Sequence, residues 1–206
     1  NLLRVFEEAM RTGLLIHPNA MRLLSANLHL IDGSMRKSDE AIRIFIDILL
    51  KHGNPERGLR RMNELGVLAA FIPEFEPIVA MMQFNMYHHY TVDEHTIRAI
   101  GLLSQIERGL LAADHPRGTR EISKVASRRA LYVAVLLHDI AKGRRGDHSV
   151  LGADVALKLC PRFGLDEKDA ELVSWLVRNH LIMSATAFKR DLADWKTISD
   201  FVAQVQ

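Results

Sequence analysis

Histidines next to acidic side chains are the residues of this chain that are best suited to chemistry. Ten of the 206 residues are histidine. His138 and Asp139 stand together after a nearly continuous apolar run, residues 131–137. An aspartate at the end of a buried helix loses its hydration, and a divalent cation compensates well for that loss. Imidazole nitrogen and carboxylate oxygen together suit manganese, iron, zinc, cobalt or magnesium. The pair therefore predicts a metal site.

Four further candidate ligands stand at the ends of predicted helices: His95, His148, His180 and Asp191. Helix ends can converge when the helices pack side by side, so these side chains could meet at one site. Each of them alone has a simpler explanation. A histidine is usually hydrogen-bonded in the core or complements a helix dipole, and an aspartate near a helix start is usually a cap. The metal interpretation therefore depends on the whole set.

Helical patterns dominate the chain and position these residues. The spacing of apolar residues predicts helices over residues 40–52, 55–65, 92–109, 148–160 and 166–180. Thr91 followed three residues later by Glu94 is a capping-box pattern, which puts His95 in a first helical turn. Segment 67–77 contains two prolines and is predicted to be a loop or a short turn segment. No alternating strand pattern of any length is present, so the predicted fold class is all-α.

Composition narrows the setting of the protein. The formal net charge is only +2, so no charge excess calls for nucleic acid or a membrane surface as partner, and we expect neither. Cys160 is the one cysteine, which excludes an internal disulfide and favours a reducing, cytoplasmic location. The sequence shows no signal peptide and no run long enough to span a bilayer. It opens and closes in helical patterns without an initial Met, which indicates a fragment of a longer protein.

Several ordered segments resemble one known family: residues 55–59, 90–96, 137–143, 146–149, 179–181 and 190–191. His95, the pair His138-Asp139 and Asp191 follow the order of the signature of the HD phosphohydrolase superfamily. The residues within these segments are similar to those of the HD domain of the bacterial bifunctional PII uridylyltransferase/uridylyl-removing enzymes. A lone His-Asp dipeptide is a weak signal, but the ordered set is specific and the resemblance covers essentially the whole chain.

The resemblance implies a fold and an activity. It implies an HD-domain helical bundle at residues 79–206, preceded at residues 1–78 by a helical linker or subdomain. It implies hydrolysis of the phosphodiester that joins UMP to a tyrosine of the nitrogen-signalling protein PII, so uridylylated PII is the expected substrate. In the longer protein a nucleotidyltransferase domain would precede this chain and small-molecule-sensing ACT domains would follow it.

The resemblance also implies roles for the ligands. One ion is assigned to His95, His138, Asp139 and Asp191. His148 and His180 are assigned to a second ion or to phosphate contact, with Asp139 as the bridge. The expected cofactor is one or two divalent ions per chain, manganese or magnesium first, with iron, cobalt or zinc as alternatives.

Two further residues have two open roles each. Lys142 lies one helical turn after His138, where it either holds a phosphate oxygen or balances the helix dipole as a solvated cation. Asp147 either orients His148 as a carboxylate behind the ligand or caps the following helix, and both roles are compatible. With Asp139, they form the predicted catalytic set.

Two alternative functions remain open from the sequence. Other HD domains hydrolyse free nucleotides, cyclic nucleotides or alarmones, and the same ligand set serves all of these reactions. A non-catalytic regulatory HD module that relays signals between flanking domains is the second alternative. An incomplete ligand set would favour it, and the set in this sequence is complete.

Overall fold

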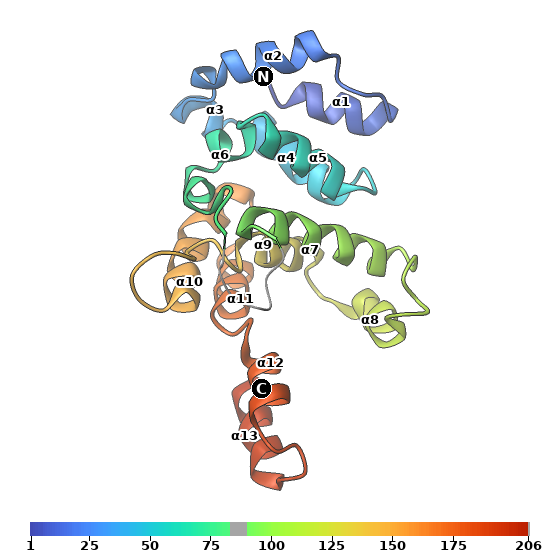
Figure 1. The fold of residues 1–206 in the computed structure, drawn as a ribbon, viewed down its shortest axis with the longest axis vertical. Helices are drawn as coiled ribbons and strands as arrows, with labels where there is room; N and C mark the ends of the chain where they lie inside the picture. Colours follow the sequence, from blue (N-terminus) through green and yellow to red (C-terminus); the bar gives the residue numbers. More distant parts are fainter. Residues whose placement is uncertain (83–89, 206) are drawn as a thin grey trace.

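The computed structural model describes residues 1–82 and 90–205, and within those ranges it contains α-helices and short 3-10 helices but no strand. The predicted all-α fold class is confirmed. The chain runs from a layer of N-terminal helices, through a central bundle, to a pair of helices that extends from the far side of the bundle (Figure 1).

The N-terminal helices are α1 (Arg4–Thr12), α2 (Pro18–Ala26), η1 (Leu28–Leu30), α3 (Gly33–Lys37), α4 (Asp39–Leu50), α5 (Pro55–Glu64), α6 (Val67–Phe71) and η2 (Pro73–Ile78). Helices α4 and α5 lie where the apolar spacing predicts them. The prediction of a loop or short turn segment at 67–77 is wrong, because this segment forms the short helices α6 and η2. Pro73 stands in the first turn of η2, where a missing backbone N–H removes no helical hydrogen bond.

The remaining helices are α7 (Val92–Glu107), α8 (Pro116–Glu121), η3 (Ile122–Lys124), α9 (Arg128–Leu137), α10 (His148–Leu159), η4 (Cys160–Phe163), α11 (Glu167–Arg178), α12 (Ile182–Lys189) and α13 (Trp195–Val205). Helix α9 packs against α4, α7, α10 and α11 and is the central buried helix that its apolar sequence predicts. The C-terminal end of α9 is therefore surrounded by neighbouring helices.

One continuous core joins the N-terminal helices to the bundle. Phe45 of α4 packs against Phe71, with ring centroids 5.2 Å apart, and against Phe163, with centroids 5.6 Å apart. The Arg162 guanidinium lies 4.6 Å from the Phe71 ring centroid and donates through Nε to the carbonyl oxygen of Arg36 at 2.9 Å. The bundle that carries the predicted ligands is therefore supported from the N-terminal side.

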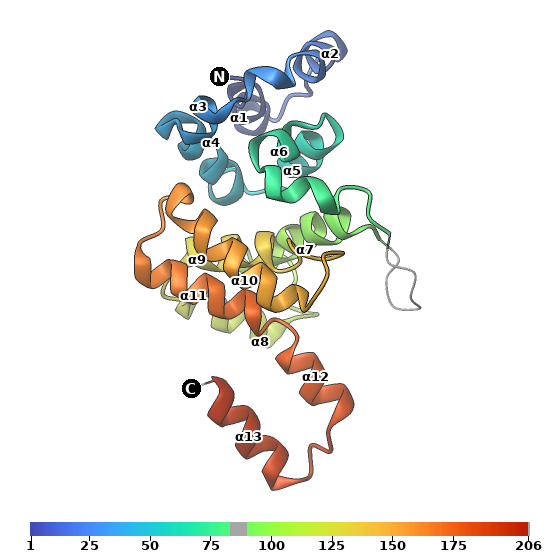
Figure 2. The ribbon, with the colours of Figure 1, turned by 90° about the vertical axis from the view of Figure 1, so that its left-hand side faces the viewer.

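The two last helices are packed far less than the rest. Helix α12 contains no buried residue, and α13 contains only Thr197. Figures 1 and 2 both show α12 and α13 extending away from the bundle beyond the end of α11. Within residues 1–82 and 90–205, no helix combines the length and apolar character needed to cross a bilayer.

Candidate metal centre

The predicted pair lies where the most buried helix ends. Helix α9 stops at Leu137, His138 is its C-cap, and the chain turns until Gly143, whose φ of 80° is in the left-handed region that glycine favours. Asp139 is only 2% exposed, although its side chain is ionisable. A carboxylate this deeply buried requires compensating partners.

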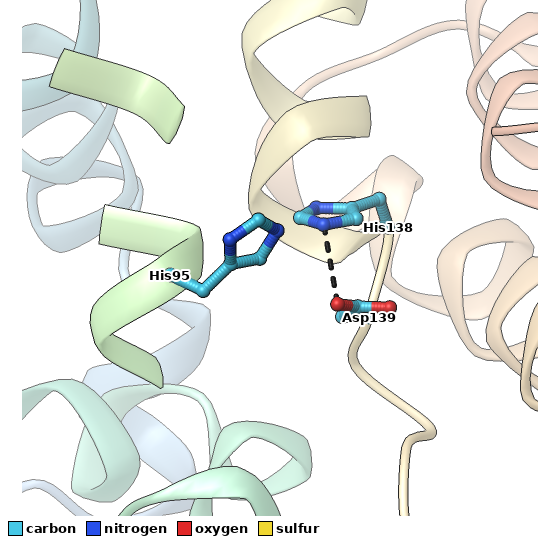
Figure 3. A group of neighbouring side chains, drawn as sticks. All are labelled: His95, His138 and Asp139. Carbon is cyan, nitrogen blue, oxygen red and sulfur yellow. Dashed lines mark ion pairs between the residues drawn. The ribbon is translucent and has the colours of Figure 1, made fainter. Parts of the chain in front are cut away.

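Histidines from three other helix ends surround that carboxylate. His95 and His138 form one group with Asp139 (Figure 3), and His148 and His180 form a second group with the same aspartate. Within each group, the nitrogen and oxygen atoms that could bind a metal all lie within 4.8 Å of one another. Asp139 is shared by both groups, as expected for a carboxylate between two ion sites.

Helix ends orient two of the imidazole rings. The Nδ1 atom of His138 lies 2.7 Å from the carbonyl oxygen of Val135, and Nδ1 of His180 lies 2.7 Å from that of Val177. The last carbonyl groups of a helix have no intrahelical partner, so they are free to accept from these rings. With Nδ1 held at the carbonyl group, Nε2 faces Asp139. Nε2 donates to the carboxylate when it carries the proton, and it offers its lone pair to a metal when Nδ1 carries the proton.

Sequence reasoning missed these carbonyl contacts. They do have a signal, since each histidine lies within two residues of a helix end and three residues after its carbonyl partner.

Distances around Asp139 place both carboxylate oxygens in contact with cations or imidazoles. Oδ2 lies 2.7 Å from Lys142 Nζ and 3.3 Å from His138 Nε2. Oδ1 lies 3.6 Å from His180 Nε2 and 3.7 Å from His148 Nε2. Burial raises the pKa of Asp139, but His138, His180 and Lys142 outweigh burial and hold this pKa well below its usual range. The group is therefore an anionic carboxylate at neutral pH.

Helix α10 brings His148 to the site as its first residue. Asp147 is the N-cap, and its Oδ1 accepts from the backbone N–H groups of Ser149 at 2.8 Å and Val150 at 3.4 Å. The capping role predicted for Asp147 is confirmed. Burial lowers the pKa of His148, as does the positive charge of Lys142, while Asp139 opposes them. The neutral imidazole that results is the form that binds metal.

This donor set fits a divalent cation. Metal–ligand bonds of about 2.0–2.3 Å place neighbouring ligand atoms roughly 3–4 Å apart, and the distances from Asp139 to the three histidines fall in that range. Asp139 Oδ1 and His148 Nε2 are moreover buried, and neither has a hydrogen-bond partner within residues 1–82 and 90–205. Buried polar atoms are nearly always satisfied, so two unsatisfied atoms that face each other point to an ion between them.

Asp191 is the predicted ligand that the structure does not bring to this cluster. It lies in the exposed turn between α12 and α13, and its Oδ1 accepts from the backbone N–H of Ala193 at 2.9 Å. The local geometry is that of a capping aspartate. Its assignment to the metal stays a prediction, because the direction of the α12–α13 pair decides where Asp191 lies.

Two other predicted contacts differ in detail. Thr91 is the N-cap of α7 and His95 lies in the first turn, as expected, but the Thr91 hydroxyl makes no capping hydrogen bond. Glu94 does not turn back to the cap, because its Oε1 accepts from Arg60 of α5 at 2.6 Å.

Lys142 is only 16% exposed and pairs with Asp139. It is therefore not the solvated cation of the simpler interpretation.

Comparison with known families gives the class of protein. Residues 92–204, more than half of the chain, match the family model of the HD domain. The chain belongs to the HD-domain family. Residues 1–71 match a second family model, described as the third domain of the uridylyltransferase GlnD.

Individual relatives agree along the whole chain. The chain is 64% identical over 206 residues to a bifunctional uridylyltransferase/uridylyl-removing enzyme of Ruegeria pomeroyi, covering all of this chain and 23% of that protein. Enzymes of the same name match at 64% identity in Cereibacter sphaeroides and 57% in Azospirillum brasilense, again over all of this chain and 22% of each relative. The chain thus spans less than a quarter of the length of these relatives.

Proposed function

We propose that this chain is a metal-dependent phosphodiesterase that removes UMP from a uridylylated tyrosine of the signal protein PII. The observation that carries the proposal is the buried Asp139 shared by two histidine groups, which is a donor set for ions that bind phosphate. The names of the relatives, which include a uridylyl-removing activity, support the choice of reaction. Flanking nucleotidyltransferase and ACT domains would complete the longer protein.

The proposed ligands are His95, His138, Asp139, His148, His180 and Asp191. Bound divalent ions, manganese or magnesium first, would supply Lewis acidity and a water of lowered pKa. The histidines would present neutral Nε2 atoms, and Asp139 would present one oxygen to each group. Asp191 joins this set only if the α12–α13 pair turns back toward the end of α11.

The remaining residues of the site would handle the substrate's charge. Lys142 holds Asp139 in the structure, and we propose that its ammonium also binds a phosphate oxygen of the substrate. The leaving tyrosine oxygen is a phenolate, whose conjugate acid has a pKa of about 10, so its departure needs only modest assistance. Asp147 would act indirectly by fixing where α10 begins and therefore where His148 lies.

The direct test is steady-state hydrolysis by the purified chain with manganese. Uridylylated PII, a cyclic nucleotide and a guanosine tetraphosphate-type alarmone would be compared at equal concentration. Release of UMP from PII at least tenfold faster than turnover of the others supports the proposal. Turnover of the small nucleotides alone would favour the alternative HD hydrolase. No turnover of any substrate, with metal bound, would favour a regulatory module.

A further inference from the structure

A cavity lies away from the metal centre, at the junction of the segments that match the two family models. It has a volume of about 550 Å³ and is lined by residues of α1, α5, α7 and the segment after α1. Phe6, Met10 and Ile16 give it an apolar wall. A volume of this size, with apolar and polar walls, is typical of sites for small molecules.

The charged residues that line this cavity have an excess of positive charge: Glu56, Glu64, Arg57, Arg60, Arg61 and Arg108. Two of the arginines are neutralised within the cavity wall. Arg60 pairs with Glu56 at 2.7 Å, and Arg61 pairs with Glu64 at 2.7 Å. Arg57 and Arg108 have no carboxylate partner among the described residues, so the cavity holds two uncompensated guanidinium groups.

Backbone carbonyl groups hold both of these arginines in place. Nη2 of Arg57 donates to the carbonyl oxygens of Gly13 at 3.0 Å and Leu14 at 2.8 Å. Nη1 of Arg108 donates to the carbonyl oxygen of Gly53. A carbonyl group accepts a hydrogen bond without neutralising the charge. On each arginine, Nε and the other terminal nitrogen have no hydrogen-bond partner among the described residues, so both guanidinium groups keep donors for a ligand.

The cavity wall is continuous with the helix that carries His95. The Glu56 side chain of α5 lies against Gly101 of α7, in the space that a Cβ at this position would occupy. Arg60 bridges Glu56 of α5 and Glu94 of α7. Glu94 directly precedes His95, so the cavity and the metal centre share one helix.

We propose that this cavity binds a small organic dianion with an apolar body. The two anionic charges would pair with Arg57 and Arg108, because guanidinium groups bind carboxylates and phosphates through several donors at once. The apolar body would pack on Phe6, Met10 and Ile16. This inference is independent of the reaction proposed for the metal centre.

The test uses phenylphosphonate, a dianion with an aromatic body, on the chelator-treated chain, so that bound metal cannot attract the probe. Calorimetry gives the Kd, and the ε-methyl signal of Met10, assigned with Met10→Leu, reports on the cavity. We expect one saturable site and a shifted Met10 signal. Arg57→Gln and Arg108→Gln should each weaken binding about tenfold or more. Arg22→Gln on α2 removes the same charge outside the cavity and should leave the Kd within twofold.

Four outcomes would overturn the proposal. Saturable binding that both arginine substitutions leave unchanged would place the probe elsewhere, as would an unshifted Met10 signal. Inorganic phosphate that binds as tightly as phenylphosphonate would exclude the apolar part of the site. The absence of binding at millimolar concentration would exclude the site itself. If Arg57→Gln unfolds the chain, Arg57→Lys, which keeps the charge, and Arg108→Gln still decide the matter.

Discussion

Replacing Lys142 by alanine separates the proposed phosphate contact from the support that this lysine gives to Asp139. In the metal-free chain the substitution removes a charge-assisted hydrogen bond of 2.7 Å to a carboxylate that is 2% exposed. Hydrogen bonds to charged groups contribute about 1.5–3 kcal/mol. Because three imidazoles still face the carboxylate, we expect the free energy of unfolding to fall by about 2 kcal/mol. With manganese bound, the ion offsets the lost ammonium and the cost should fall below about 1 kcal/mol.

Urea denaturation with and without manganese measures this difference, and hydrolysis of uridylylated PII measures the second role. If Lys142 binds a phosphate oxygen, Lys142→Ala should lower turnover by roughly 10–1000-fold, or about 1.4–4 kcal/mol of barrier stabilisation. Metal content should stay near that of the parent, because an ammonium group is not a ligand. Lys142→Arg should restore only part of the rate. It keeps the positive charge, but the guanidinium is longer than the ammonium group and planar.

Two results would contradict these two roles of Lys142. An equal loss of stability with and without manganese would mean that no ion compensates the charge of Asp139. A metal-saturated Lys142→Ala enzyme that turns over within twofold of the parent would reject the phosphate contact and leave Lys142 with its ion pair alone.

Three further predictions follow from the site and the core. His148→Ala and His180→Ala should each lower manganese content, measured by elemental analysis, from two ions per chain toward one; an unchanged content would exclude them as ligands. Asp191→Asn should weaken manganese binding about tenfold if the α12–α13 pair turns toward the cluster, and an unchanged affinity would remove Asp191 from the ligand set. Tyr132→Phe should cost about 1.5–3 kcal/mol in urea denaturation, because the fully buried Tyr132 donates to Glu107 at 2.7 Å. A cost below about 0.5 kcal/mol would mean that water replaces that donor.

The sequence was a good guide wherever local patterns decide the structure. Apolar spacing predicted α4, α7 and α10, and the positions of His95 and His148 followed from helix starts. The two prolines of segment 67–77 favour a loop or turn over a helix. Pro73, in the first turn of η2, is nevertheless compatible with a helix, and Pro77 lies inside the same short 3-10 helix.

Features that depend on tertiary contacts could not be predicted. Glu94 fits a capping box by spacing alone, but the position of Arg60 across the interface decides its partner. The location of Asp191 depends on how the chain turns after α11, and α12 has no buried residue whose pattern would fix that direction. The ion pair of Lys142 with Asp139 likewise needs the folded turn.

A crystal structure of the chain with manganese, measured at the manganese absorption edge, decides whether Asp139 and the histidines bind an ion. We expect anomalous density within about 2.0–2.3 Å of an Asp139 oxygen and of Nε2 atoms from His138, His148 or His180. We further expect the peak to be lost in crystals of the Asp139→Ala variant. Manganese density elsewhere on the chain, with none beside Asp139, would contradict the metal centre and the hydrolysis proposed from it.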